Sequence, residues 1–261
     1  MQISLRWLEE WVDLSGIAVD ELSHRLTMAG LEVDAVEEIG GDVGEIVVGR
    51  IDAIESHPNA DRLVVCEVDV GDSTSRSIVC GASNMSEGDF VPVALPGSRP
   101  PAVDFEIASR EVRGEPSEGM LCSGEELGLE ESSEGLLILP EGFERGADVF
   151  EGLGLRDTTI EFDLTPNRSD CLSHLGVARE VSAIWDRPLR EPNYADGPFV
   201  WETSEASASA LEAASREVRD PEGCPRYAFA VAEGIEVGPS PLWLKSRLAA
   251  VGTRSVNNIV D

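Results

Sequence analysis

The chain has 261 residues, 42% of them hydrophobic, and its 50 acidic and 20 basic residues give a formal net charge of −30. The hydrophobic content excludes a largely disordered protein, and the length allows two domains or more, each with its own core. No apolar run approaches the roughly 18 residues that span a bilayer, and the charged residues between Met1 and Leu14 are not those of a signal peptide. We therefore expect a cytoplasmic protein with no membrane partner.

The excess of acidic residues indicates adaptation to a salty habitat more than the nature of a ligand. Lys245 is the only lysine in the chain. Replacement of lysines by acids is typical of halophilic proteins, because in molar salt the Debye length falls to about 3 Å and self-repulsion is screened. A charged surface that only aids solubility is the alternative. The five cysteines form no CxxC pair and lie beside apolar residues, so we expect buried thiols and no metal site.

The first 40 residues predict two short helices and a strand. Ser4 can cap the first helix, and the second is expected to begin near Asp20 and to end at Gly30. Residues 33–36 then alternate as a strand. This unit is too small for an independent core, so we expect it to need partners from later in the chain.

Between about residue 45 and residue 150 the pattern changes to short strands separated by turns. Five candidate strands cover residues 46–51, 63–70, 77–81, 90–95 and 107–113. Five short strands over about a hundred residues suit a small Greek-key barrel of the oligonucleotide-binding (OB) type. A short helix at 124–127 and a buried strand at 136–139 are also expected.

A polar loop, residues 56–63, separates the first two of these strands and can be interpreted in two ways. In one, the loop contacts nucleic acid, with Arg62 at a phosphate and His57 or Asn59 at a sugar or base. In the other, Asp61 pairs with Arg62 while His57 and Asn59 bond to the loop backbone. Both interpretations stay open. The same holds for five further arginines, which could form a basic stripe or scattered ion pairs: Arg50, Arg76, Arg99, Arg110 and Arg113.

After the barrel, residues 160–164 read as a strand, and a turn leads to a helix from Cys171 to Trp185. This strand and helix could complete the core of the first 40 residues. The barrel would then be an insertion in one discontinuous domain.

The last part of the chain predicts a third domain that is incomplete. Prolines and glycine mark a linker at 191–200, and residues 202–216 are compatible with a helix. A strand is expected at 224–231 and a helix at 241–248, with proline near its start. We expect this chain to be a fragment of a longer protein, because the third domain has no closing element.

Six motifs together resemble one family. They are Ser4-Leu5-Arg6-Trp7-Leu8, His57-Pro58-Asn59-Ala60-Asp61-Arg62-Leu63, Cys80-Gly81-Ala82-Ser83-Asn84, Ser117-Glu118-Gly119-Met120-Leu121-Cys122-Ser123, Thr165-Pro166-Asn167-Arg168-Ser169-Asp170-Cys171-Leu172 and Gly252-Thr253-Arg254-Ser255-Val256-Asn257-Asn258. In this order they are similar to the N-terminal part of bacterial-type phenylalanyl-tRNA synthetase beta subunits. The resemblance covers essentially the whole chain.

The resemblance implies an α+β architecture: a five-stranded OB-type barrel at 41–150, inserted in a small α/β domain of residues 1–40 and 151–190. A linker at 191–200 and the start of an editing domain of the B3/B4 type at 201–261 would follow. In the family, the alpha subunit charges tRNA(Phe) with phenylalanine in an (αβ)₂ assembly, with ATP and Mg²⁺ as cofactors of the whole enzyme. We expect no cofactor on this segment, no catalytic residue in it, no DNA partner and no activity of the segment alone.

The resemblance also implies binding residues. It places Ser83, Asn84, Ser117, Met120 and Ser123 near the tRNA-binding face, with His57, Asn59 and Arg62, although these small or flexible residues can equally serve as turn and cap residues. Arg254 would belong to the editing pocket, where a guanidinium could hold the terminal phosphate or sugar of tRNA; its alternative is a structural arginine. The rival functions are a stand-alone barrel that binds tRNA and an acidic assembly scaffold that does not contact RNA.

Overall fold

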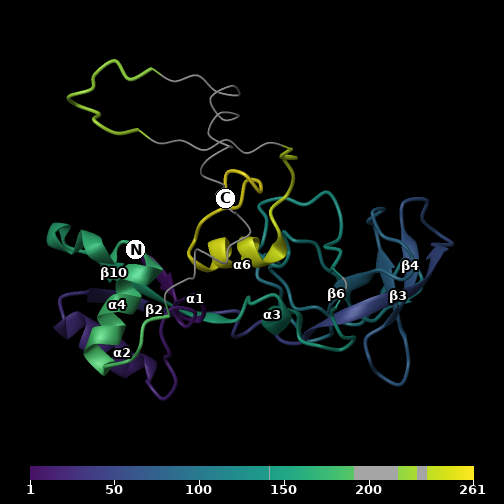
Figure 1. Cartoon of the computed structure of the whole chain (residues 1–261). Helices are drawn as coiled ribbons and strands as arrows, with labels where there is room; N and C mark the ends of the chain where they lie inside the picture. Colours follow the sequence, from purple (N-terminus) through teal and green to yellow (C-terminus); the bar gives the residue numbers. More distant parts are fainter. Residues whose placement is uncertain (141, 191–216, 228–233) are drawn as a thin grey trace. The chain divides into compact units, whose positions relative to one another are not determined.

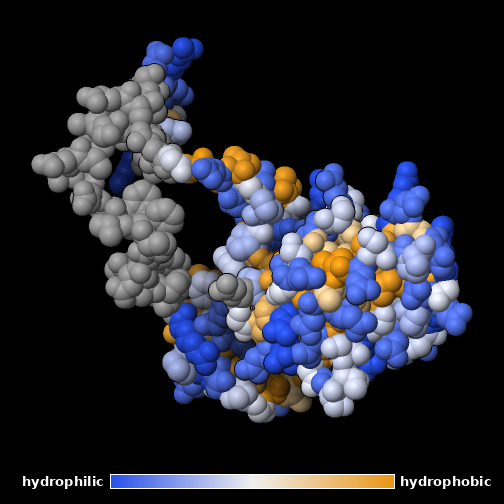
Figure 2. Space-filling view, turned by 90° about the vertical axis from the view of Figure 1, so that its right-hand side faces the viewer, coloured by the Kyte–Doolittle hydropathy of each residue, from blue (hydrophilic) through white to orange (hydrophobic). Residues whose placement is uncertain are grey.

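The computed structural model describes residues 1–140, 142–190, 217–227 and 234–261 (Figure 1). The chain forms two compact units, residues Met1–Arg190 with Pro239–Asp261 and residues Glu191–Gly238. Among the residues that the structure describes, no helix is long and apolar enough to cross a membrane. Hydrophilic side chains predominate on the face in Figure 2, and apolar side chains gather in patches between them.

A three-stranded antiparallel sheet joins the two ends of the first 190 residues. Its order is β1 (Gln2–Ser4), β10 (Asp157–Asp163) and β2 (Glu32–Ile39), so the central strand comes from far along the chain. Ile160 lies opposite Ile3 on one side and Val36 on the other. The first 40 residues therefore obtain the strand that completes their sheet from residues 157–163.

Three helices pack with this sheet: α1 (Leu5–Leu8), α2 (Val19–Met28) and α4 (His174–Trp185) (Figure 1). Buried side chains from all of these elements form one core, which includes Leu8, Leu22, Leu26, Phe162 and Val181. The burial of about ten large apolar side chains supplies the main driving force for this layer.

The helix ends match the sequence expectation in part. Ser4 caps α1, since its hydroxyl accepts a 3.0 Å hydrogen bond from the Trp7 N–H, and Gly30 ends α2 with φ at +90°. The expected cap at Asp20 is wrong: α2 begins at Val19, and Asp20 lies in its first turn, where a carboxylate suits the helix dipole. The expected helix from Cys171 is also shorter, because residues 166–171 form the 3₁₀ helix η1 (Pro166–Cys171) and Ser173 caps α4.

A five-stranded antiparallel sheet forms the nearly closed barrel. Its strand order is β5 (Arg76–Cys80), β4 (Val64–Asp69), β3 (Ile46–Ser56), β6 (Phe90–Ala94) and β9 (Met120–Leu121). The predicted OB-type barrel is therefore present with four of its predicted strands, three of them close to the predicted ranges, whereas β3 runs to Ser56 where the prediction ended at residue 51. Gly49 in β3 lies where a Cβ atom would approach a Val93 methyl group to 2.5 Å, so the interior leaves space only for glycine there.

The predicted fifth barrel strand, residues 107–113, is wrong in its extent and in its place, because only residues 110–112 form a strand and it lies outside the barrel sheet. Ile107 is buried, and its N–H bonds to the Ser98 carbonyl at 2.9 Å outside any strand. Residues Arg110–Val112 form β7, which pairs only with β8 (Glu115–Ser117) as a separate hairpin. The turn between them has positive φ at Arg113 (+53°) and Gly114 (+97°), which folds the chain back on itself. The fifth barrel strand is β9, two residues long.

Two smaller predictions for the barrel segment are also wrong. Residues 124–129 form a turn in place of the expected helix, and residues 136–139 form a single bridge, Leu139 to Phe90, in place of a strand. A short helix, α3 (Val149–Gly152), was not predicted. Backbone groups in such short segments pair with whichever neighbours the fold supplies, so local pattern alone does not define them.

The predicted helix near the end of the chain is present as α6 (Leu242–Ala250), directly after Pro241. The expected strand at 224–231 has no strand in its described part, residues 224–227, and the remainder lies outside the described residues. The expected linker at 191–200 and helix at 202–216 also lie outside the described residues.

His174, the first residue of α4, packs against α1 and the end of β1. Its ring stacks on Trp7 with centroids 4.1 Å apart, and Nε2 accepts a 3.1 Å hydrogen bond from the Ser4 N–H. Burial, with a smaller contribution from Arg247, lowers the pKa of His174 from 6.5 to about 4. The ring is therefore neutral in the folded protein at neutral pH.

We expect the stability of the folded chain to fall as the pH falls from about 6.5 to about 4. In that window the unfolded chain binds a proton on His174 that the folded chain does not, which costs roughly 2 kcal/mol after allowance for partial exposure. The measurement is urea unfolding across this pH range for the wild type and for His174→Gln, which cannot titrate but keeps an acceptor. Parallel curves for the two proteins would contradict the assignment.

Candidate nucleic-acid interface

The loop of residues 57–63 holds the β7–β8 hairpin through His57. The side chain of His57 is 5% exposed. Its Nδ1 accepts a 3.0 Å hydrogen bond from the Asn59 N–H, so Nε2 carries the proton and donates to the Val112 carbonyl at 2.9 Å. Both ring nitrogens are thus occupied by backbone groups of the protein.

Asn59 makes a second link to the same hairpin. Its side-chain Nδ2 donates to the Arg113 carbonyl at 3.1 Å. The two links join segments that are 54 and 55 positions apart in the sequence. They fix the hairpin turn against the loop, although the hairpin shares no ladder with the five-stranded sheet.

Ser117 anchors the other end of the hairpin and helps to close the barrel. Its buried hydroxyl accepts a 3.1 Å hydrogen bond from the Val79 N–H of β5 and donates to the Gly119 carbonyl at 3.2 Å. The Glu118 N–H also bonds to the Ser77 carbonyl at 2.9 Å. The hairpin therefore spans from the edge strand β5 to the 57–63 loop.

Asn84 fixes a second loop, and Ser83 beside it is exposed. The Asn84 amide makes two 2.9 Å hydrogen bonds to the backbone of Leu136, donating to its carbonyl and accepting from its N–H. This pattern imitates strand pairing and leaves no room at Gly135, where a Cβ atom would lie 2.2 Å from the Asn84 oxygen.

Met120 and Ser123 line a cavity of about 700 Å³ between β5, β9 and the 133–136 segment. Ser123 begins the following turn, because its N–H donates to the Glu126 carboxylate at 2.6 Å and its hydroxyl accepts from the Glu126 N–H at 3.2 Å. The lining contains no basic residue but four acidic ones, Asp104, Glu125, Glu126 and Glu134. The predicted site residues thus fall into two groups, one beside the hairpin and one in or beside an acidic cavity.

The barrel arginines also fall into two groups. Four form ion pairs with carboxylates, Arg50 with Asp52, Arg76 with Asp72, Arg99 with Glu106 and Arg145 with Asp69. The other three, Arg62, Arg110 and Arg113, are exposed and form no ion pair within the described part of the chain. The alternative in which Asp61 pairs with Arg62 is therefore not found among the described residues. All three arginines belong to the 57–63 loop and the hairpin docked on it.

The unpaired group was not evident from the sequence, where all the barrel arginines stand among acids. The one usable signal was Gly114, because glycine readily adopts the positive φ that a tight hairpin turn requires; the positive φ of Arg113 is seen only in the structure. Sequence reasoning treated residues 107–113 as a barrel strand and so missed the hairpin that carries two of the three arginines.

Arg254 lies away from the barrel strands, after α6. It forms a 2.8 Å ion pair with Glu131 and is 63% exposed. With Lys245, which pairs with Glu130 at 2.5 Å, it lines a cavity of about 400 Å³. The described residues give Arg254 a structural partner and leave the predicted role in an editing pocket untested.

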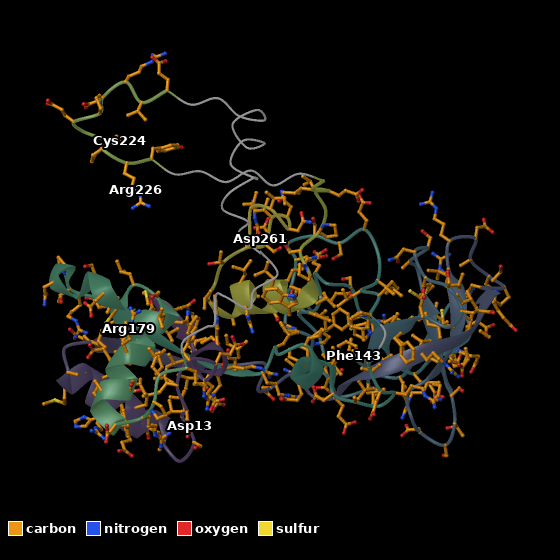
Figure 3. The ribbon with its side chains drawn as sticks, in the orientation of Figure 1. Asp13, Phe143, Arg179, Cys224, Arg226 and Asp261 are labelled. Atoms are coloured by element: carbon orange, nitrogen blue, oxygen red, sulfur yellow. The ribbon has the colours of Figure 1, made fainter. Side chains whose placement is uncertain are left out.

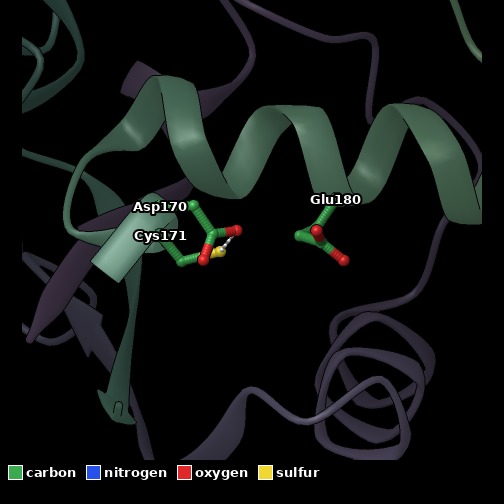
Figure 4. A group of neighbouring side chains, drawn as sticks. All are labelled: Asp170, Cys171 and Glu180. Carbon is green, nitrogen blue, oxygen red and sulfur yellow. Dashed lines mark hydrogen bonds between the residues drawn. The ribbon is translucent and has the colours of Figure 1, made fainter. Parts of the chain in front are cut away.

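A group of metal-ligating side chains lies at the junction of η1 and α4: Asp170, Cys171 and Glu180 (Figure 4). The centre of this group is taken by the Arg168 guanidinium, which lies 2.8 Å from Glu180, 3.1 Å from Asp170 and 3.0 Å from the Cys171 sulfur. Burial raises the pKa of the Cys171 thiol to about 11, so the sulfur is protonated at neutral pH. An arginine cation occupies this cluster and offsets one of its two carboxylate charges, and the residues do not fit a metal site as they stand.

Comparisons with known proteins bear directly on the barrel and on the end of the chain. Residues 46–148 match the family of putative tRNA-binding domains, and residues 223–261 match the B3/4 domain family. Among solved structures, the C-terminal domain of Plasmodium vivax p43 is 26% identical over 40% of this chain and 58% of that chain, with a TM-score of 0.30.

Over its full length the chain is similar to curated phenylalanine–tRNA ligase beta subunits. It is 48% identical to those of Syntrophus aciditrophicus and Syntrophotalea carbinolica and 44% identical to that of Geobacter sulfurreducens, in each case over 100% of this chain and 31% of the relative. The resemblance drawn from the six motifs is confirmed, and the chain spans about a third of the length of these relatives.

Proposed function

We propose that this chain is the N-terminal part of a phenylalanine–tRNA ligase beta subunit and that its barrel binds tRNA. The observation that carries the proposal is the 48% identity over the entire chain, together with the match of residues 46–148 to putative tRNA-binding domains. The whole enzyme would charge tRNA(Phe) with phenylalanine, using ATP and Mg²⁺, as a cytoplasmic (αβ)₂ assembly with the alpha subunit.

The proposed domains follow from the same comparison and from the strand pairing. Residues 1–40 and 151–190 would form one discontinuous domain, since β10 pairs between β1 and β2. Residues 41–150 would be the inserted barrel and 191–200 a linker. Residues 201–261 would begin an editing domain, to which Arg254 contributes, and we expect no hydrolysis of mischarged tRNA by this chain alone.

For the barrel, the proposed binding residues are those that line the hairpin, the adjoining loop and the acidic cavity: His57, Asn59, Arg62, Ser83, Asn84, Ser117, Met120 and Ser123. His57, Asn59, Asn84 and Ser117 already bond to backbone groups, so we expect them to act mainly by shaping the surface. Arg62 has a free guanidinium that suits a phosphate.

The test is a binding measurement of the 261-residue chain with tRNA between about 0.1 M and about 2 M salt. A net charge of −30 repels RNA at long range, so we expect binding to be weak in dilute buffer and to appear once salt screens that repulsion. A DNA hairpin of equal length is the control and should bind more weakly. No tRNA binding at any salt concentration would contradict the proposal and favour an acidic assembly scaffold.

A further inference from the structure

We propose that Arg62, Arg110 and Arg113 form the phosphate-binding site of the barrel, and that His57 and Asn59 hold this site in place without contacting RNA. The inference rests on the proposed function, the binding of tRNA, and goes beyond it by assigning the contact and by separating contacting from positioning residues.

Most arginines of the barrel are already paired with carboxylates. Acidic residues outnumber basic residues by 50 to 20, so a surface arginine in this chain readily finds a carboxylate. Four of the seven arginines between residues 46 and 148 have one, at 2.7 Å for Arg50 and 2.6 Å for Arg76. The three without an ion pair in the described structure are therefore the cations that this barrel leaves available for an external anion.

These three arginines lie on two segments that hydrogen bonds join, the 57–63 loop and the β7–β8 hairpin. Arg62 lies in the 57–63 loop, and Arg113 occupies the turn whose carbonyl accepts the Asn59 bond at 3.1 Å. Arg110 is on β7, directly opposite the buried Ser117. Three carboxylates share these two segments, Asp61, Glu111 and Glu115, and Glu118 follows directly, yet within the described part none of them pairs with the three arginines.

Hydrogen bonds hold the β7–β8 hairpin at both ends. The His57 ring and the Asn59 amide bind its turn, and the Ser117 hydroxyl binds its base to β5. A pre-positioned guanidinium loses less conformational freedom when it binds a phosphate in the bidentate manner that arginine allows. Because the His57 nitrogens are both occupied, this residue acts through the hairpin and is a positioning residue.

The acidic cavity lined by Met120 and Ser123 is unsuited to phosphate. Its four carboxylates repel phosphate, and it contains no compensating basic residue. The phosphates are therefore directed to the arginines, so a contact of tRNA with Met120 or Ser123 would involve its uncharged parts. The arginine contact is with the sugar–phosphate backbone, so it contributes affinity and orientation with little sequence preference.

The test compares two triple variants of the 261-residue chain in tRNA binding across the same salt range. One replaces Arg62, Arg110 and Arg113 by glutamine, and the matched control replaces the ion-paired Arg50, Arg76 and Arg99 by glutamine. Each variant removes three positive charges from the same barrel, so long-range repulsion rises equally in both. Only the first removes the proposed contacts.

We expect the first variant to bind tRNA at least about tenfold more weakly than the control and to change the salt dependence. Each phosphate contact contributes about −0.7 to −0.9 to the slope of log K against log salt, so the loss of three contacts should make the slope of the first variant about 2 to 3 units more positive than that of the control. The control gives the change in slope that the added long-range repulsion produces by itself. Hydrogen exchange of residues 110–117 should be unchanged in both variants, which shows that the hairpin is intact.

A positioning role for His57 is tested with His57→Ala and His57→Gln. Alanine should increase hydrogen exchange in the hairpin and weaken tRNA binding, whereas glutamine, which can donate to the Val112 carbonyl, should restore both in part. Loss of binding in His57→Ala with unchanged hairpin exchange would overturn the positioning role.

The outcomes separate the two proposals. Equal slopes and affinities for the two triple variants, with tRNA bound by the wild type, would overturn the assignment of the arginines and leave the tRNA-binding function standing. Absence of wild-type binding at every salt concentration would overturn both. A slope about 2 to 3 units more positive in the first variant than in the control would support both.

Discussion

Replacing Arg168 by alanine should lower the free energy of unfolding by about 3 kcal/mol. The Arg168 side chain is 16% exposed and bonds to Asp170, Glu180 and the Ala29 carbonyl, the last at 3.2 Å. Its removal leaves two carboxylates and the carbonyl that ends α2 without their donor, in a chain that already carries excess negative charge. Lysine should not restore stability, because one ammonium group cannot reproduce the fork that reaches three partners.

The control for this prediction is Arg179→Ala on the same helix, α4. Arg179 is exposed (Figure 3) and has no ion pair within the described ranges, so its loss should change stability by less than about 0.5 kcal/mol. Urea unfolding at fixed pH and salt gives both values. Equal stability of Arg168→Ala and Arg179→Ala would show that the cluster at η1 does not depend on its arginine.

Replacing Gly176 by alanine should destabilise the same junction by about 3 kcal/mol or more. A Cβ atom at Gly176 would lie 2.0 Å from the Asp170 carbonyl oxygen and 2.9 Å from the Cys171 Cα. Because both of these are backbone atoms, α4 would have to shift away from η1, and the buried Cys171 and Val177 beside it would lose packing.

Gly41→Ala provides the control for Gly176→Ala, since the nearest neighbour of a Cβ there is the Glu38 carboxylate at 3.6 Å. We expect it to change stability little. The measurement is again the free energy of unfolding, with far-ultraviolet circular dichroism to establish that each variant folds. Wild-type stability of Gly176→Ala would mean that the contact between η1 and α4 opens at little cost.

Local chemistry explains what could be read without the structure. Ser4 caps a helix, and Gly30 ends one with a positive φ. The alternating pattern of residues 64–69 is a barrel strand with Cys66 and Val68 buried. Each of these features depends on a residue and its near neighbours in sequence, so the pattern was sufficient.

Pairing between residues that are distant in the sequence explains which predictions were wrong. The strand expected at 107–113 was defined by its pattern, but the turn at Arg113 and Gly114 directs it into a hairpin, and Met120 pairs with Ala94 in its place. The roles of the loop residues could not be predicted for the same reason. Nothing near His57 in sequence shows that its ring reaches Val112, 55 positions away.

The sequence by itself therefore determined the OB-type barrel, the family resemblance and the excess of acid, because composition and short-range periodicity carry that information. Only the tertiary structure decided which arginines have carboxylate partners. An ion pair such as that of Arg145 with Asp69 joins residues 76 positions apart, and whether Arg62 finds a similar partner depends on how the hairpin and the loop meet. Since charge pairing is a property of distance in space, the sequence could count the arginines of this barrel but could not separate the paired from the free.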